Sequence, residues 1–176
     1  MEERLFRTDT KALVGAVILG IVFLIMMQVT GRIDGILDPT LLLFNGTCWS
    51  FFTGLIILMY RQPAGIISGL LEAVVAMATA YSPLAFFFLF ANTIGSIAYS
   101  LVAAKLSMEK LSHHILAQIA SNVTGNFCVM LGLITVVHLD WKVALVTSSI
   151  TTLVATIVAG ILTKSVYGAL KKSSLI

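Results

Sequence analysis

Residues 12–29, ALVGAVILGIVFLIMMQV, form an apolar run without a charged side chain. A helix needs about 20 mostly apolar residues to cross the hydrocarbon core of a bilayer, so this run is close to the length required. Glu2, Glu3 and Asp9 precede the run, and no Ala-x-Ala site follows it. These flanks favour a spanning helix over a cleaved signal peptide.

Further apolar stretches of similar length follow along the chain. We expect six spanning helices in all, at about residues 12–29, 41–60, 64–80, 84–104, 115–137 and 142–163. The composition agrees, because 59% of the 176 residues are hydrophobic and only 11% are charged. A soluble domain carries about a quarter charged residues, so a soluble enzyme or a nucleic-acid-binding protein is disfavoured. The expected fold class is an all-α integral membrane protein, a compact helical bundle that forms one membrane domain over residues 1–176.

Lysine and arginine are divided unevenly between the two ends of the expected bundle. Nine lie at the end that holds both termini: Arg4, Arg7, Lys11, Arg61, Lys105, Lys110, Lys164, Lys171 and Lys172. Arg32 and Lys142 lie at the opposite end. Because cytoplasmic loops carry an excess of Lys and Arg, both termini are predicted to be cytoplasmic. The longest outer loop, residues 30–40, is rich in Gly and Asp and is expected to form a mobile cover.

Glu72 is the one charged residue expected well inside a span. It lies nine residues after Pro63, which is about 13 Å along a helix and therefore near the middle of the membrane. A charge at that depth costs at least about 2.5 kcal/mol, so an intramembrane carboxylate indicates a ligand or proton site by default. The functional interpretation places Glu72 in a wet vestibule open to the outside. The alternative is a hydrogen-bonded structural glutamate.

Other polar and aromatic residues are expected at a similar level of the outer half. Asn45 and Trp49 lie four residues apart on the second span, as do Asn92 and Ser96 on the fourth. Tyr81 lies at the outer boundary, where it would anchor the bundle or help to roof a pocket. Such a group suits a small, flat, water-soluble ligand, although interhelical amide bonds also simply hold bundles together. The candidate binding residues are Glu72, Asn92, Trp49, Asn45, Ser96, Asn126 and Tyr81.

No motif of a catalytic, metal or cofactor site accompanies these residues. The sequence has no P-loop, no His-Glu-x-x-His and no Gly-x-Ser-x-Gly. Cys48 and Cys128 lie singly in apolar runs, without the paired spacing of a metal site. We therefore expect no catalytic residue, no metal and no cofactor in this chain, which cannot bind ATP in a P-loop of its own.

Small residues recur every four positions on the first span, at Ala12, Ala16 and Gly20. One face of that helix is nearly flat, so another helix could approach it closely, inside the monomer or in a partner. Six spans, cytoplasmic termini, no nucleotide site and this alanine row together resemble the substrate-binding S components of energy-coupling factor (ECF) vitamin transporters. Within residues 49–77, the stretch Tyr60-Arg61-Gln62-Pro63-Ala64-Gly65 looks like the branch linked to thiamine precursors such as hydroxymethylpyrimidine.

The resemblance implies a non-catalytic module in a prokaryotic cell membrane that captures a small vitamin from outside. In that family the Ala-x-x-x-Ala motif, here Ala12 and Ala16, docks onto a transmembrane coupling subunit that works with two ATP-binding subunits. Two alternatives remain open. A proton-coupled secondary transporter would act alone and use Glu72 as its proton carrier. A membrane enzyme or assembly factor is less favoured, because no catalytic constellation is present.

Overall fold

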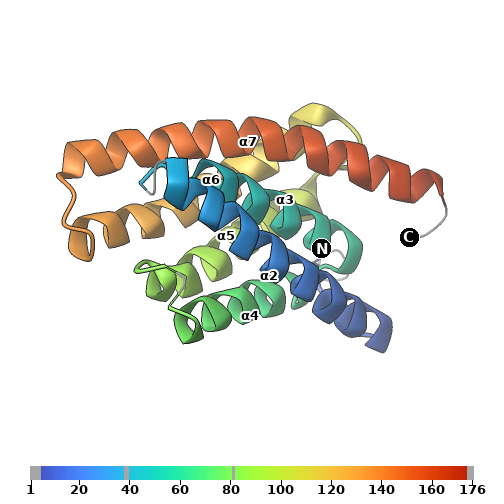
Figure 1. The fold of residues 1–176 in the computed structure, drawn as a ribbon. Coiled ribbons are helices and arrows are strands. Elements are labelled where there is room, and N and C mark those ends of the chain that lie inside the picture. The colour runs from blue at the N-terminus through green and yellow to red at the C-terminus, as the bar shows by residue number, and fades with distance from the viewer. Residues whose placement is uncertain (1–4, 38–39, 81, 174–176) are drawn as a thin grey trace.

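The computed structural model describes residues 5–37, 40–80 and 82–173 of the chain. These residues contain six helices, labelled as in Figure 1. Their bounds are α2 (Thr10–Leu37), α3 (Leu43–Tyr60), α4 (Ala64–Ala78), α5 (Ala85–Lys105), α6 (Leu111–Thr135) and α7 (Trp141–Lys172). The fold of the described residues is therefore all-α.

Five of the six helices are long and apolar enough to cross a membrane. The exception is α4, whose 15 residues extend about 22 Å, less than a hydrocarbon core of about 30 Å. Large apolar side chains lie on the outer surface, and Ile18 and Leu153 are 58% and 62% exposed. Such a surface suits contact with lipid. The chain is a multi-pass membrane protein, and its described residues contain five candidate spans, one fewer than the sequence predicts.

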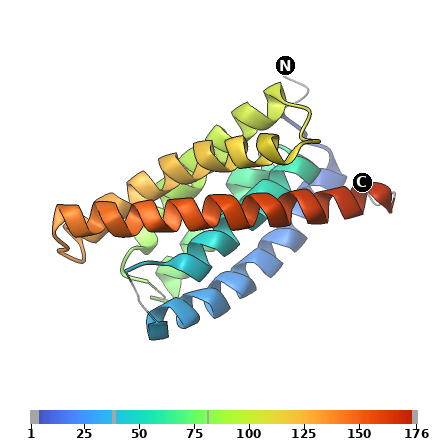
Figure 2. The same cartoon turned by 90° about the horizontal axis from the view of Figure 1, so that it is seen from above.

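The central helix of the bundle is α3. It packs against each of the other five, which follow one another around it in the order α2, α4, α5, α6 and α7 (Figures 1 and 2). The ring is open on one side, because α2 and α7 make no contact with each other within the described residues. An apolar groove of about 600 Å³ lies in this gap, lined between the two helices by α3 residues that include Phe44, Cys48 and Phe51.

Successive helices run in opposite directions, so the two termini lie at the same end of the bundle (Figure 2). We call this the terminal end, and the opposite end the far end. At the terminal end the N-terminal segment pairs with the turn between α3 and α4. The backbone N–H of Arg7 donates to the carbonyl oxygen of Gln62 at 2.7 Å, and the N–H of Gln62 donates to that of Leu5 at 2.9 Å.

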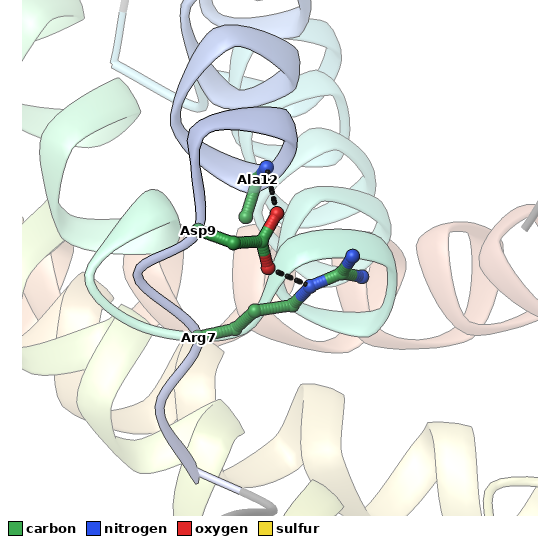
Figure 3. Close-up of polar contacts among 3 residues, drawn as sticks. All are labelled: Arg7, Asp9 and Ala12. Atoms are coloured by element: carbon green, nitrogen blue, oxygen red, sulfur yellow. Dashed lines mark hydrogen bonds and ion pairs between the residues drawn. The ribbon is translucent and has the colours of Figure 1, made fainter.

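Asp9 caps the first turn of α2 at the terminal end. Figure 3 shows its carboxylate between the backbone nitrogen of Ala12, which donates at 3.0 Å, and the Nε of Arg7, which donates at 2.5 Å. The bond from Arg7, followed by the bond from Ala12, holds the pKa of Asp9 below its ordinary value. The capping carboxylate therefore stays ionised as the pH falls towards the ordinary range of an aspartate.

The α2 helix is longer than the sequence predicts. It continues through Gly31 and Gly35 to Leu37, so most of the loop expected over residues 30–40 is helical. Each glycine in a helix costs about 1 kcal/mol relative to alanine, a penalty that tertiary contacts can offset. The mobile cover predicted for this stretch is thus absent over residues 30–37, while residues 38 and 39 lie outside the described part of the chain.

Asp34 supplies the contact that holds the end of α2. Its side chain is 2% exposed, and its two oxygens accept the backbone N–H groups of Phe44 at 3.0 Å and Asn45 at 2.7 Å. These amides belong to the first turn of α3 and have no partner within their own helix. Asp34 therefore caps α3 from another helix. It is buried, as Glu72 is, so the described bundle holds two buried acidic residues.

The row of small residues on α2 lies inside the bundle. Ala12 and Ala16 are fully buried, and a Cβ at Gly20 would lie 3.3 Å from the Cβ of Ser68 on α4. Close packing of α2 within the monomer is thus the role that the geometry gives to this row. The expectation that Ala12, Ala16 and Gly20 present a face to a coupling subunit does not fit this arrangement, because no partner can reach them.

Candidate functional site

A small cavity lies among α2, α3, α5 and α6 in the half of the bundle nearer the far end. Its volume is about 30 Å³. Its walls are Met27, Leu42, Asn45, Gly46, Trp49, Phe88, Ala91, Asn92, Gly125, Asn126 and Val129. Four predicted binding residues therefore meet around one space: Asn45, Trp49, Asn92 and Asn126.

Two glycines on neighbouring helices make room for the Trp49 side chain. A Cβ at Gly95 of α5 would lie 2.7 Å from Cη2 of the indole, and one at Gly125 of α6 would lie 2.6 Å from it. The indole is 6% exposed, and its Nε1–H has no hydrogen-bond partner among the described residues. A buried donor without a partner costs about 1–3 kcal/mol. Such an atom requires an explanation, and a ligand or water that accepts the bond would supply one.

Asn92 connects the cavity to Glu72. Its amide nitrogen donates to the carbonyl oxygen of Gly69 at 2.7 Å and to Oε2 of Glu72 at 2.9 Å. The absence of a side chain at Gly69 permits this approach, because a Cβ there would lie 2.8 Å from the Cβ of Asn92. Both amide hydrogens of Asn92 are thus used within the bundle, which leaves its amide oxygen for a ligand.

Glu72 lies behind the cavity wall. Its side chain is 2% exposed, and it is not among the lining residues. Oε2 accepts the bond from Asn92, whereas Oε1 is buried without a partner among the described residues. Among the described residues no open vestibule surrounds the carboxylate, in contrast to the prediction. In this arrangement Glu72 positions the Asn92 amide and keeps one acceptor oxygen unused.

The other two asparagines join helices as well as line the cavity. Nδ2 of Asn45 donates to the carbonyl oxygen of Met27 on α2 at 3.3 Å. Nδ2 of Asn126 donates to Oγ1 of Thr152 on α7 at 2.9 Å. Both asparagines therefore hold helices together, as the structural interpretation of such amides expects. They also line the cavity beside Trp49 and Asn92.

Ser96 lies away from the cavity, although it shares a helix face with Asn92. Its hydroxyl accepts a bond from Nε2 of Gln62 at 2.8 Å and is fully buried, one turn closer to the terminal end. The structure thus gives Ser96 a place in the packing of the α3–α4 turn. Tyr81, the remaining predicted residue, lies outside the described residues.

The cavity as it stands has room for about one water molecule. Pockets for small molecules usually have volumes of about 300–1,000 Å³, so a vitamin-sized ligand requires the surrounding helices to move apart. Leu42, which lines the cavity just before α3, has a φ of 47°. This left-handed conformation is unfavourable for leucine and lies where the chain enters the site from the far end.

Several residues that shape the site carry no clear signal in the sequence. Gly95 and Gly125 accommodate the indole ring, but each is an isolated glycine in a long apolar helix. Asp34 lies nine residues before the helix that it caps, whereas the usual capping signal is adjacent to the helix. Comparison of the chain with protein families, with curated proteins and with solved structures finds no match.

Proposed function

We propose that this chain is the substrate-capture component of an ECF-type importer, which binds a small vitamin or vitamin precursor in the cavity beside Trp49. The observation that carries the proposal is the meeting of an indole and three amides, from three helices, around one enclosed space. Two buried groups in this region lack partners among the described residues: the Nε1–H of Trp49, which lines the space, and the Oε1 of Glu72, which lies behind Asn92. A set of unpaired groups in one region favours ligand binding over packing.

The chemistry of the site favours a flat ligand that both donates and accepts hydrogen bonds. The Trp49 N–H requires an acceptor, and the oxygen of Asn92 is available to accept a bond from a ligand donor. A ligand that entered beside Asn92 could also reach the free oxygen of Glu72 after a small shift of the amide. An aminopyrimidine such as hydroxymethylpyrimidine has ring nitrogens that accept and an exocyclic amine that donates, so it suits this set.

We infer an orientation in which the terminal end faces the cytoplasm, from the nine Lys and Arg residues expected at that end. The cavity then lies in the outer half of the bundle, on the side from which a nutrient arrives. The small volume corresponds to a closed form, and we propose that the segment around Leu42 opens to admit the ligand. The fully buried Ala12 and Ala16 leave the contact with the coupling subunit to another surface of the chain.

The decisive experiment measures uptake of labelled hydroxymethylpyrimidine into liposomes. Liposomes that hold this chain alone are compared with liposomes that also hold a coupling subunit and two ATP-binding subunits. The proposal predicts binding by the chain alone, and ATP-dependent uptake only with the partners. The chain itself is then a non-catalytic module.

A proton-coupled secondary transporter is the second candidate, and the unpaired buried Oε1 of Glu72 favours it. In the same liposomes, this candidate predicts uptake by the chain alone when a pH gradient is imposed. It also predicts that Glu72→Gln abolishes this uptake. Uptake without partner subunits would overturn the importer proposal.

A further inference from the structure

A second hollow lies at the terminal end, between α6, α7 and the connection before α6. Its volume is about 440 Å³. Its lining residues are Met108, Glu109, His114, Lys164, Tyr167, Gly168, Lys171 and Lys172. The lining therefore contains three lysines and one glutamate, and the hollow carries an excess of positive charge.

The three lysines of α7 are available to an external anion. All are exposed, and the one ion pair within the described residues joins Arg7 to Asp9. No carboxylate in the described part of the chain, that of Glu109 included, lies within ion-pair distance of Lys164, Lys171 or Lys172. The charge of the hollow is thus not neutralised by its own residues.

His114 adds a buried polar atom without a partner to the same hollow. The residue is 1% exposed, and its Nε2 lies 2.9 Å from the carbonyl oxygen of Met108. A carbonyl only accepts hydrogen bonds, so Nε2 must carry the hydrogen of this contact. Nδ1 is buried and has no partner among the described residues. A hydroxyl of a bound glycerol headgroup could donate to Nδ1 of the neutral ring, and a protonated ring could donate to a phosphate oxygen.

The position of the hollow in the bundle indicates the source of such an anion. It lies where α6 begins, at Leu111, and where α7 ends, at Lys172. In a bilayer these helix ends reach the level of the lipid headgroups. Basic hollows between membrane helices on the cytoplasmic side are suited to anionic headgroups.

We propose that this hollow binds the phosphate group of an anionic phospholipid, held by Lys164, Lys171 and Lys172 with His114 at its inner wall. The shared chemistry is that of a phosphate ester, and the lipid is its source because the hollow opens at headgroup level. This site is separate from the cavity beside Trp49, so the proposal stands whether or not the chain captures a vitamin.

The test is a lipid titration of the purified full chain, followed by native mass spectrometry. The probes are phosphatidylglycerol, phosphatidylcholine and soluble glycerol phosphate. The test variant combines Lys164→Gln, Lys171→Gln and Lys172→Gln. The control variant combines Lys11→Gln, Lys105→Gln and Lys110→Gln, which remove the same charge at the same end outside the hollow. His114→Gln is measured as a separate variant, and gel filtration checks that every variant is folded.

We expect the test variant to lose at least about tenfold in affinity for phosphatidylglycerol, with a smaller loss in the control. We also expect His114→Gln to weaken phosphatidylglycerol and to leave phosphatidylcholine unchanged. Equal losses in the two triple variants would mean that charge at this end acts without a site, and would overturn the proposal. Binding of glycerol phosphate with the same dependence on the three lysines would overturn the assignment to lipid.

Discussion

Two buried polar clusters of this bundle differ in how completely their hydrogen bonds are made. In the cluster around Gln62, the side-chain nitrogen donates to Oγ of Ser96 at 2.8 Å and to Oγ of Ser100 at 2.9 Å. The side-chain oxygen accepts the backbone N–H of Ile66 at 3.1 Å. At the cavity beside Trp49, by contrast, the indole N–H of Trp49 has no partner within the described residues, and neither has Oε1 of Glu72, which lies behind the cavity wall.

The difference separates a polar cluster that holds helices together from one that is prepared for a ligand. A satisfied network in a low-dielectric interior adds stability and fixes the arrangement of helices. An unsatisfied network costs stability, so its presence requires another reason. Substitutions in the first cluster should therefore change stability, and those in the second should change binding.

The largest effect is expected for Gln62→Leu. The Gln62 side chain makes three hydrogen bonds: its two amide hydrogens go to the hydroxyls of Ser96 and Ser100, and its oxygen accepts the N–H of Ile66. Polar contacts between membrane helices contribute about 0.6 kcal/mol each on average, so we expect the free energy of unfolding to fall by about 2 kcal/mol. Thermal unfolding in detergent measures the change.

Gln28→Leu on α2 is the matched control for this substitution. Gln28 is half-buried, and no hydrogen bond joins its side chain to another described residue. We expect its replacement to leave the unfolding midpoint nearly unchanged. If both substitutions lowered the unfolding midpoint equally, the hydrogen bonds of Gln62 would not be the source of the lost stability.

Glu72→Gln should change ligand affinity and leave stability nearly unaltered, the reverse of Gln62→Leu. The glutamine oxygen can still accept the bond from Asn92, so we expect stability to be unchanged or slightly higher once the buried charge is removed. Affinity for hydroxymethylpyrimidine should fall by at least about 1.5 kcal/mol, or about tenfold, because a charge-assisted hydrogen bond is lost. Parallel unfolding and binding measurements decide between the two roles. Lower stability with unchanged affinity would make Glu72 a structural residue.

Asp34→Asn tests a buried carboxylate near the cavity whose two oxygens, unlike those of Glu72, both accept hydrogen bonds. Two N–H groups bind its two oxygens, and an amide can accept only one of them. We expect a loss of about 1 kcal/mol in unfolding free energy. The control is Asp140→Asn at the start of α7, where one oxygen accepts the N–H of Lys142 and an amide could replace it. A loss in the control as large as in Asp34→Asn would contradict capping by both oxygens.

The smallest effect is expected for Asp9→Asn, at the exposed start of α2. Because Arg7 and the Ala12 N–H lower the pKa of Asp9 in the folded chain, its ionised form stabilises the fold above the pKa of the unfolded chain. We expect a slight drop in the unfolding midpoint at neutral pH. The difference from the wild type should shrink as the pH falls through the ordinary value of 3.8 and below. A difference independent of pH would contradict this role.

Hydropathy predicts most of the helices, because a chain in hydrocarbon must form its backbone hydrogen bonds locally. It misplaces the end of α2, since Gly31, Asp34 and Gly35 resemble a loop when read alone. Asp34 bonds to residues 10 and 11 positions ahead, and only the folded bundle reveals that contact. Similarly, the row from Ala12 to Gly20 allows close packing against any helix, and the sequence does not say which one.

In the candidate site, too, the sequence predicts which residues share a helix face but not which helices meet. Four-residue spacing correctly predicts that Asn45 and Trp49 share a face, and the structure places both beside one cavity. The same spacing groups Ser96 with Asn92, yet Ser96 lies one turn away and bonds to Gln62. Whether Glu72 lines the cavity or stands behind Asn92 depends on the close approach of two helices at Gly69, which spacing along one helix does not report.

Tryptophan fluorescence of the Trp141→Phe variant tests most directly whether the unpaired groups beside Trp49 bind a ligand. Trp141 is 58% exposed, so its replacement should leave the interior intact and make Trp49 the sole emitter. Titration with hydroxymethylpyrimidine, thiamine and other vitamins should give a saturable change for one ligand, and Trp49→Phe, which retains Trp141, should give none. A flat titration with every vitamin, or a saturable response only in Trp49→Phe, would contradict binding at this cavity.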